Sequence, residues 1–219
     1  AFYDEDEIEN KNGNIVSKSS GSLVEWVEEE SYFFKLSAWG DKLLKFYEEN
    51  KNFILPKSRM NEVTRFVEKG LKDLSISRTS FTWGIQVPEN NKHIIYVWLD
   101  ALTNYLSALD FPNIDGKMYK NFWPASVHII GKDIIRFHAV YWPAFLLAAK
   151  LPIPKRIFGH GWILSDTKKM SKSLGNILDP IEMIKEYGLD PLRYYLIKEV
   201  SFGNDGNISQ DRLEDCINS

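Results

Sequence analysis

A short stretch with several lysines offers the most distinctive chemistry in this sequence. Lys168, Lys169 and Lys172 stand close together among serine and glycine residues, with few apolar side chains to anchor the segment. Ammonium groups on long flexible stems act as point charges that can neutralise the phosphates of a polyphosphate ligand. A solvated basic loop without any ligand has the same composition, so the residues alone leave both interpretations open. A Walker-type phosphate loop is excluded, because the glycine spacing that it requires is absent.

Three short runs rich in β-branched and aromatic residues predict strands that could position such a loop. They are residues 93–98, 127–130 and 156–158, and segments with helical periodicity at 100–109 and 134–150 separate them. This alternation predicts a parallel sheet with crossover helices, which binds ligands at the carboxyl ends of its strands. Chemically unusual residues gather at those ends: Trp98 to Asp100, Gly131 to Asp133, and Gly159 to Trp162.

One of these strand ends could hold a ribose. Asp133 follows Gly131, and a carboxylate can accept hydrogen bonds from both ribose hydroxyls, while glycine lets the backbone approach a nucleotide closely. Asp133 could instead cap the following helix, and the two roles are compatible.

The remaining segments are predicted to be a small α+β module before the sheet and helices after it. The first part has a polar loop at 10–22, a strand at 32–34, a helix at 38–50 and a helix at 62–69. Asn61 is the expected cap of that second helix and Gly70 its end. The last part is predicted to form helices at 181–187, at 190–199 and from 210 onward.

Composition excludes several classes of protein. The 219 residues are 44% hydrophobic with a net charge of −3, which suits a globular chain and does not indicate nucleic-acid binding overall. A single cysteine, Cys216, excludes an internal disulfide and a cysteine-rich zinc site, and fits a reducing cytoplasm. No apolar run approaches a membrane span, and no signal-peptide pattern is present. Because the chain starts at Ala1 without an initiator methionine, we expect a piece of a longer protein.

The lysine stretch resembles the signature loop of class I aminoacyl-tRNA synthetases. Lys169-Met170-Ser171-Lys172-Ser173 matches that loop, with Gly159-His160-Gly161-Trp162-Ile163 before it and Leu174-Gly175-Asn176 after it. The resemblance implies that an amino-acid carboxylate attacks the α-phosphate of ATP, giving an aminoacyl-adenylate that is then passed to tRNA. It further implies that Lys169 and Lys172 are catalytic, stabilising the departing pyrophosphate beside Mg2+ bound to ATP. The implied ATP-binding residues are Gly131, Asp133, His160, Ile163 (through its backbone, at the adenine) and Lys172.

Two further segments resemble the methionyl-tRNA synthetase family. They are Val97 to Tyr105, and Gly131 to His138 with Trp142 four residues on. A thioether is well held by aromatic rings in a dry pocket, although composition alone favours an ordinary core position for the two tryptophans and for His138. The implied methionine-binding residues are Trp98, Ala101, Tyr105, Ile134, His138 and Trp142, with Arg78 as an arginine that reaches the substrate.

The resemblance also implies a division of the chain. Residues 1–92 would be a connective α+β module and 93–162 the second half of a Rossmann-like catalytic domain. Residues 163–219 would hold the lysine loop, helices that contact the tRNA stem, and the start of the anticodon-binding domain. Lysines and arginines in that last segment, such as Lys185, Arg193 and Lys198, could contact tRNA phosphates, whereas no DNA or membrane partner is expected.

Two departures from the family pattern qualify these expectations. The histidine signature of the first half of the nucleotide-binding fold is absent, so the 219-residue chain by itself is expected to be inactive. No cysteine lies in residues 1–90, where many relatives carry a zinc knuckle, so no zinc is predicted in this chain. Two other functions stay open at this point: a non-catalytic module that binds tRNA or a partner, and a class I synthetase for leucine, valine or cysteine.

Overall fold

The computed structural model describes most of the chain and divides it into two compact units. The described residues are 8–11, 13–18, 21–25, 28–165, 168–170 and 177–218, so Lys172 lies outside them, as does the side chain of Lys169. The first unit contains residues 1–32 and 76–96, and the second contains residues 33–75 and 97–219. This division cuts across the boundary expected at residue 92.

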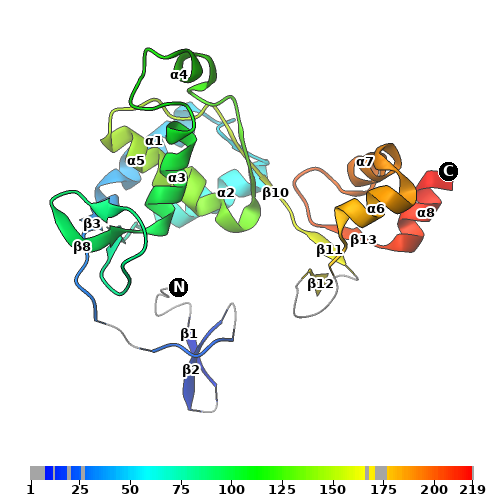
Figure 1. The fold of residues 1–219 in the computed structure, drawn as a ribbon, viewed down its shortest axis with the longest axis horizontal. Coiled ribbons are helices and arrows are strands. Elements are labelled where there is room, and N and C mark those ends of the chain that lie inside the picture. Colours follow the sequence, from blue (N-terminus) through cyan, green and yellow to red (C-terminus); the bar gives the residue numbers. More distant parts are fainter. Residues whose placement is uncertain are drawn as a thin grey trace. The chain divides into compact units, whose positions relative to one another are not determined.

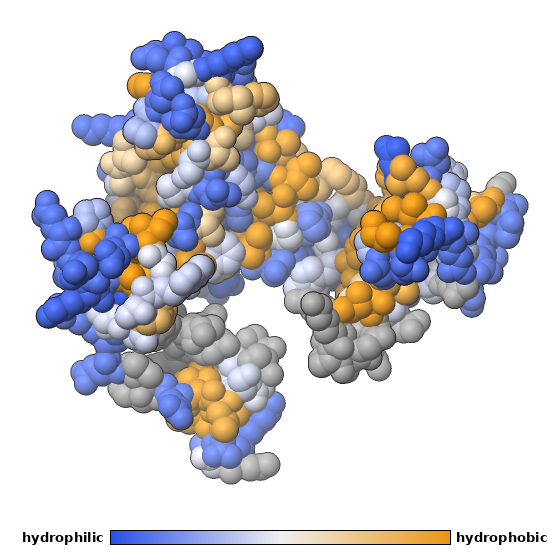
Figure 2. Space-filling model, viewed as in Figure 1, coloured by the Kyte–Doolittle hydropathy of each residue, from blue (hydrophilic) through white to orange (hydrophobic). Residues whose placement is uncertain are grey.

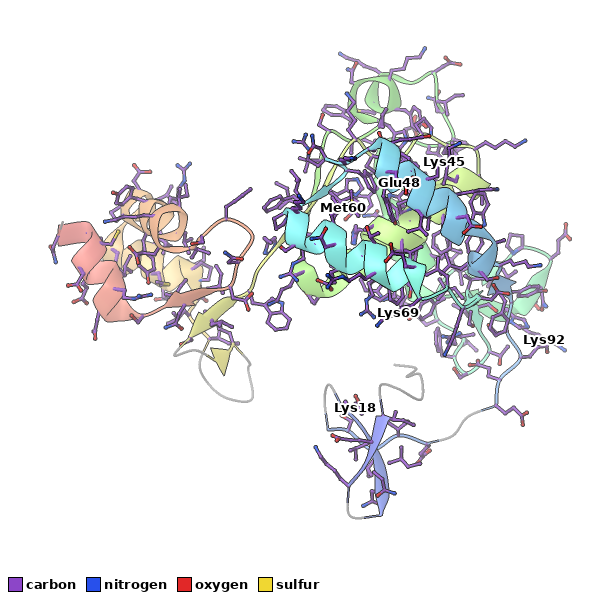
Figure 3. All side chains as sticks on the ribbon, turned by 180° about the vertical axis from the view of Figure 1, so that it is seen from behind. Lys18, Lys45, Glu48, Met60, Lys69 and Lys92 are labelled. Carbon is purple, nitrogen blue, oxygen red and sulfur yellow. The ribbon has the colours of Figure 1, made fainter. Side chains whose placement is uncertain are left out.

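The first unit is built from antiparallel strands. β1 (Ile8–Lys11) and β2 (Asn14–Ser17) form a hairpin, and β8 (Asn90–Ile95) pairs with both β6 (Ser77–Arg78) and β7 (Gln86–Val87). Hydrophilic side chains cover the β7–β8 hairpin (Figure 2), and Lys92 points outward from it (Figure 3). The run at 93–98 was expected in the parallel sheet, and that prediction is wrong: its strand ends at Ile95 and pairs only antiparallel. Strand pairing depends on tertiary neighbours more than on β-propensity, which explains the error.

The second unit contains the parallel α/β core that the sequence predicted. β10 (Ile157–His160) lies between β4 (Ile54–Leu55) and β9 (His128–Gly131), parallel to both. Helices surround these strands (Figure 1). They are α1 (Gly40–Glu49), α2 (Lys57–Glu68), α3 (Val97–Ser107), α4 (Lys117–Phe122) and α5 (Trp142–Ala148).

Helices α1 and α2 bury their apolar faces against this sheet. Leu43 and Tyr47, four residues apart on α1, are buried in the same cluster as Ile54 and Ile157 of the strands. Figure 3 shows α1 and α2 side by side, with Lys45 and Glu48 on the outer side of α1. Helix α2 begins at Lys57 rather than after Asn61, so the predicted cap is wrong. Pro56, in an extended conformation that fits a residue just outside a helix, starts the helix one turn earlier.

Gly70 ends α2 as expected. Its φ of +89° lies in the left-handed region, which glycine adopts without steric cost. The next strand, β5 (Leu74–Ser75), pairs antiparallel with β3 (Phe33–Phe34) from earlier in the chain.

The helical segment expected at 134–150 is present but irregular. A 3₁₀ turn (Lys132–Ile134) leads into a π-helical stretch (Phe137–Tyr141) and then into α5. The Tyr47 hydroxyl donates a 2.6 Å hydrogen bond to the Ala139 carbonyl within the π-helical stretch, and both residues are buried. The α1 helix therefore fixes the segment that carries His138.

Replacing Tyr47 by phenylalanine is expected to destabilise this arrangement. The buried Ala139 carbonyl would lose its side-chain donor, and the free energy of unfolding should fall by about 1–3 kcal/mol. Urea denaturation measures the change, and Tyr194→Phe at an exposed tyrosine is the matched control. Equal stabilities of the two variants would contradict the assigned role of this bond.

The C-terminal part of the second unit is mainly helical, as predicted. Its helices are α6 (Pro180–Tyr187), α7 (Leu189–Glu199) and α8 (Gln210–Asn218), and Asp179 caps α6 by accepting from the Ile181 amide at 2.7 Å. The sequence did not predict the sheet beside them, in which β11 (Ile163–Ser165) pairs antiparallel with β12 (Lys168–Lys169) and parallel with β13 (Gly206–Ile208). Through β13, this segment is attached directly to the strand that precedes the lysine loop.

Candidate functional site

Aromatic side chains from α3, the π-helical stretch and the first residue of α5 form one cluster in the second unit. The Trp98 and Phe137 rings stack with centroids 3.7 Å apart and planes at 13°. Tyr105 lies 5.7 Å from His138 and 6.4 Å from Trp142, again between ring centroids. On α3, Trp98 and Tyr105 are seven residues apart and therefore share one face of the helix. The structure thus brings together four of the residues predicted from sequence to line a pocket.

Hydrogen bonds fix the tautomer of the His138 ring within this cluster. Nδ1 lies 3.0 Å from the Ile134 carbonyl oxygen, which can only accept, so Nδ1 carries the proton. Nε2 lies 2.9 Å from the Tyr105 hydroxyl and therefore accepts a hydrogen bond from it when the ring is neutral. Burial lowers the pKa of His138, which favours this neutral form. The cluster consequently presents an oriented, uncharged imidazole and a phenol oxygen whose proton is engaged.

The ends of the parallel strands meet beside the cluster. In the register of β9 and β10, Gly131 pairs with His160, so the two strand-end loops start side by side. The Asp133 carboxylate folds over Gly131, where an added Cβ would lie 2.5 Å from Oδ1. It also accepts a 3.3 Å hydrogen bond from the indole of Trp162. Gly131 rather than Asp133 stands at the N-cap position of the 3₁₀ turn, so the capping interpretation is not supported.

Comparison with known proteins identifies the family. The family model described as tRNA synthetases class I (M) matches residues 4–219. The chain belongs to this family.

Relatives of this class I family match along the whole chain. Methionine–tRNA ligases from Rickettsia bellii and Brucella suis are 57% and 55% identical, and each match covers 100% of this chain but 42% of the relative. A solved Mycobacterium tuberculosis methionyl-tRNA synthetase in complex with methionyl-adenylate is 52% identical with a TM-score of 0.95. The apo form from that organism gives a TM-score of 0.90 at 49% identity. The chain spans less than half the length of these proteins.

The other predicted site residues of this class I chain lie on α3, on the 3₁₀ turn and on strands β10 and β11, or are not tested by the structure. Ala101 is exposed on α3, one turn before Tyr105, and Ile134 contributes the carbonyl that orients His138. His160 is exposed at the end of β10, and Ile163 starts β11. Arg78 belongs to the first unit, where its guanidinium lies 4.6 Å from the centre of the Tyr96 ring, so its contact with substrate stays a prediction. The structure describes only the backbone of Lys169, which belongs to β12, and Lys172 lies outside the described residues.

Sequence reasoning missed three members of the aromatic cluster. Phe137 stacks on Trp98, His128 lies 4.1 Å from Tyr105 between ring centroids, and Trp123 lies 6.1 Å from Trp142. His128 was visible only as part of a strand, and a π-helical stretch that brings Phe137 to Trp98 has no sequence signature. Among the described residues, His128 Nδ1 and Trp142 Nε1 are buried without a hydrogen-bond partner. These two ring nitrogens are therefore candidates to contact a ligand.

His128 should make the stability of this class I chain depend on pH. Burial, with a smaller contribution from neighbouring His138, lowers its pKa from 6.5 to about 4. Between these values the unfolded chain binds a proton that the folded chain does not. His128 should therefore not reduce the free energy of unfolding above pH 6.5. Below that value the free energy of unfolding should fall as the pH decreases, by about 1.4 kcal/mol per pH unit at most. Urea denaturation at pH 7, 6 and 5 measures this slope.

His128→Phe separates this contribution from that of other groups. It keeps a ring in the cluster, and its stability should fall less steeply below pH 6.5 than that of the parent protein. His160→Gln, at an exposed histidine, serves as the control. Identical slopes for the parent protein and His128→Phe would show that His128 is not the titrating group.

Two features are absent from the described residues. No helix there is long and apolar enough to cross a membrane. No group of three or more histidine, cysteine, aspartate or glutamate side chains in that part of the chain could hold a metal ion.

Proposed function

We propose that this chain is part of the catalytic region of a methionine–tRNA ligase. The reaction joins methionine to ATP, giving methionyl-adenylate and pyrophosphate, and then transfers the methionyl group to tRNA. The observation that carries the proposal is the aromatic and histidine cluster, to which α3 contributes Trp98 and Tyr105 and the segment from His128 to Trp142 contributes the other rings. The same segment contains the strand-end residues Gly131 and Asp133. The high identity to methionine–tRNA ligases over the whole chain supports the same substrate.

In this proposal the cluster binds the methionine side chain. Sulfur interacts favourably with aromatic rings, and the rings of Trp98, Tyr105 and Trp142 provide such surfaces. His138 Nε2 accepts a hydrogen bond from the Tyr105 hydroxyl and so fixes the direction of that O–H group. Ala101 leaves space because its side chain is small, and Ile134 provides an aliphatic wall. Aromatic ring surfaces suit a weakly polar thioether better than a strongly polar side chain.

The strand-end loops would bind ATP. Asp133 accepts from the ribose hydroxyls, Gly131 allows close approach of the nucleotide, and the Ile163 backbone contacts adenine near His160. Lys169 and Lys172 then neutralise the charge that develops on the departing pyrophosphate. Mg2+ is expected to arrive with the ATP phosphates, and we assign it no ligand in this chain. Because the product, methionyl-tRNA, is used in protein synthesis, the proposed location of the protein is the cytoplasm.

Transfer of the methionyl group requires that tRNA reach the same site. Basic side chains on the helices after the lysine loop, among them Lys185 and Lys198, are exposed and could contact its phosphates. Binding of this kind should weaken steeply with salt. DNA and membrane surfaces are not proposed as partners.

Exchange of pyrophosphate into ATP tests the proposed reaction. The protein should be assayed at the length of its relatives, with methionine, leucine, valine and cysteine offered separately. We expect exchange with methionine and at least 100-fold less with the others. Exchange with leucine in place of methionine would indicate a different synthetase, and no exchange with any amino acid would indicate a binding module. The 219-residue chain by itself is expected to give no exchange.

A further inference from the structure

Asp205 connects the C-terminal helices to both strand-end loops of the second unit. It lies in the turn between α7 and β13. Both of its carboxylate oxygens lie 2.7 Å from the Lys132 ammonium, and Oδ1 accepts a 2.9 Å hydrogen bond from the Trp162 backbone amide. Lys132 follows β9 and Trp162 follows β10, so one carboxylate ties together the loops that leave two neighbouring strands.

A chain of contacts leads from Asp205 to the carboxylate proposed to bind ribose. Lys132, held by Asp205, places its ammonium 4.2 Å from the centre of the Trp162 ring. The indole nitrogen of the same ring donates to Asp133 at 3.3 Å. Trp162 is therefore fixed from two sides, through its backbone and through its ring, and its remaining polar group points at Asp133.

The backbone around Asp205 fits closely against the same loop. A Cβ added to Gly161 would lie 2.1 Å from the Asn204 carbonyl oxygen and 2.5 Å from the Asp205 nitrogen, so no side chain fits there. On the other side, the Gly206 amide donates to the Trp162 carbonyl at 2.9 Å, which begins the pairing of β11 with β13. The turn that carries Asp205 is thus held in register with Gly161 and Trp162.

We propose that Asp205 is a positioning residue for the nucleotide site. It fixes Lys132 and Trp162, and through the Trp162 indole it fixes the Asp133 carboxylate in the orientation that meets a ribose. This role rests on the proposed function. It also makes the turn after α7 part of the nucleotide site, although the turn lies more than 70 residues from Asp133 in sequence.

The charge of Asp205 is central to this role. Its hydrogen bonds from Lys132 and from the Trp162 amide lower the pKa of its carboxyl group, so it is ionised at neutral pH. Both partners are only partly exposed, at 19% for the Lys132 side chain and 34% for Asp205. Asp205→Asn keeps an oxygen that can accept from the Trp162 amide but removes the attraction for Lys132, which makes it a specific test of the ion pair.

Steady-state pyrophosphate exchange with the full-length protein separates positioning from simple stabilisation. For Asp205→Asn we expect the KM for ATP to rise about tenfold, as for the loss of one charge-assisted hydrogen bond. The KM for methionine should stay within twofold, because the aromatic cluster makes no contact with Asp205. Asp115→Asn is the matched control, since it breaks a comparable 2.8 Å pair with Lys120 in another segment, and both KM values should be unchanged.

Trp162→Phe provides a second, independent variant. It removes the indole donor to Asp133 and leaves a smaller aromatic ring near Lys132, and it should raise the KM for ATP in the same direction, even if Asp205→Asn folds poorly. Because both changes act on the same carboxylate, the double variant should be little worse than the more affected single variant. A rise in the KM for ATP of the double variant that equals the product of the two single rises would overturn the proposal.

The outcomes distinguish this proposal from the proposed function. If the parent protein shows no exchange, the function itself fails. If the parent protein shows normal pyrophosphate exchange with methionine while Asp205→Asn and Trp162→Phe leave the KM for ATP unchanged, the proposed function stands and the positioning role is wrong. Equal rises in both KM values would also overturn the proposal, because they would indicate a general structural effect.

Discussion

Replacing Lys172 by alanine in the full-length protein is expected to lower kcat for methionine activation by about 10²- to 10³-fold. Negative charge grows on the leaving pyrophosphate in the transition state, and a preorganised cation there is worth about 2–4 kcal/mol. The KM values for ATP and methionine should change much less, since the ground state carries less charge at that position. Pyrophosphate exchange under saturating substrates measures the effect.

The described strands that precede Lys172 in the sequence start beside the proposed nucleotide site. The lysine loop leaves β12, which pairs with β11, and β11 follows Trp162, whose indole contacts Asp133. The start of the loop is thus anchored at the proposed nucleotide site. Lys185→Ala is the control. It removes an exposed lysine of α6 whose one described ion pair is with Glu182. A Lys172→Ala enzyme with the kcat of the control would refute the catalytic role.

Replacing Tyr105 by phenylalanine is expected to raise the KM for methionine by about 10- to 100-fold. The change keeps the ring but removes the only donor within reach of His138 Nε2 among the described residues. A buried acceptor would then be unpaired, and the polar oxygen beside the proposed thioether would be lost. The KM for ATP should be unchanged, because Tyr105 makes no contact with Asp133 or Trp162.

The imidazole itself offers a control for this result. His138→Gln retains an amide nitrogen and oxygen that could replace one or both of its hydrogen bonds, and it should impair methionine binding less than His138→Ala. If Tyr105→Phe raised both KM values equally, or neither, the cluster would be an ordinary core rather than a binding pocket. Thermal unfolding of each variant shows whether its fold is intact.

Patterns of several residues predicted the parts of the fold that depend on local sequence. The β-rich runs became β9 and β10, and their parallel register brought Gly131 and His160 together as the strand-end argument required. The helices after Pro180 also formed where periodicity placed them. In these segments local propensity and burial agree, so the sequence is informative.

The errors occurred where tertiary pairing decides the structure. β4 and β13 have two and three residues, too few for any periodicity, yet β4 completes the parallel sheet and β13 attaches the C-terminal helices. The run at 93–98 has strand propensity throughout, but Val97 and Trp98 start a helix. That change of element is what places Trp98 and Tyr105 on one helical face.

The candidate site was predictable only in part for the same reason. Trp98, Tyr105, His138 and Trp142 were found because their motifs resemble a known family, whereas composition alone would have assigned them to a core. Phe137 joins them through a π-helical stretch, and Asp205 reaches the strand-end loops through a distant turn. Neither relationship has a period or spacing that a sequence can show.

A crystal structure of the full-length protein with a non-hydrolysable methionyl-adenylate analogue tests the central claim most directly. We expect the thioether to lie against the Tyr105 and Trp142 rings, within contact distance of His138, and the ribose hydroxyls to donate to Asp133. A structure with the methionine side chain elsewhere, or with the ribose away from Asp133, would contradict the account.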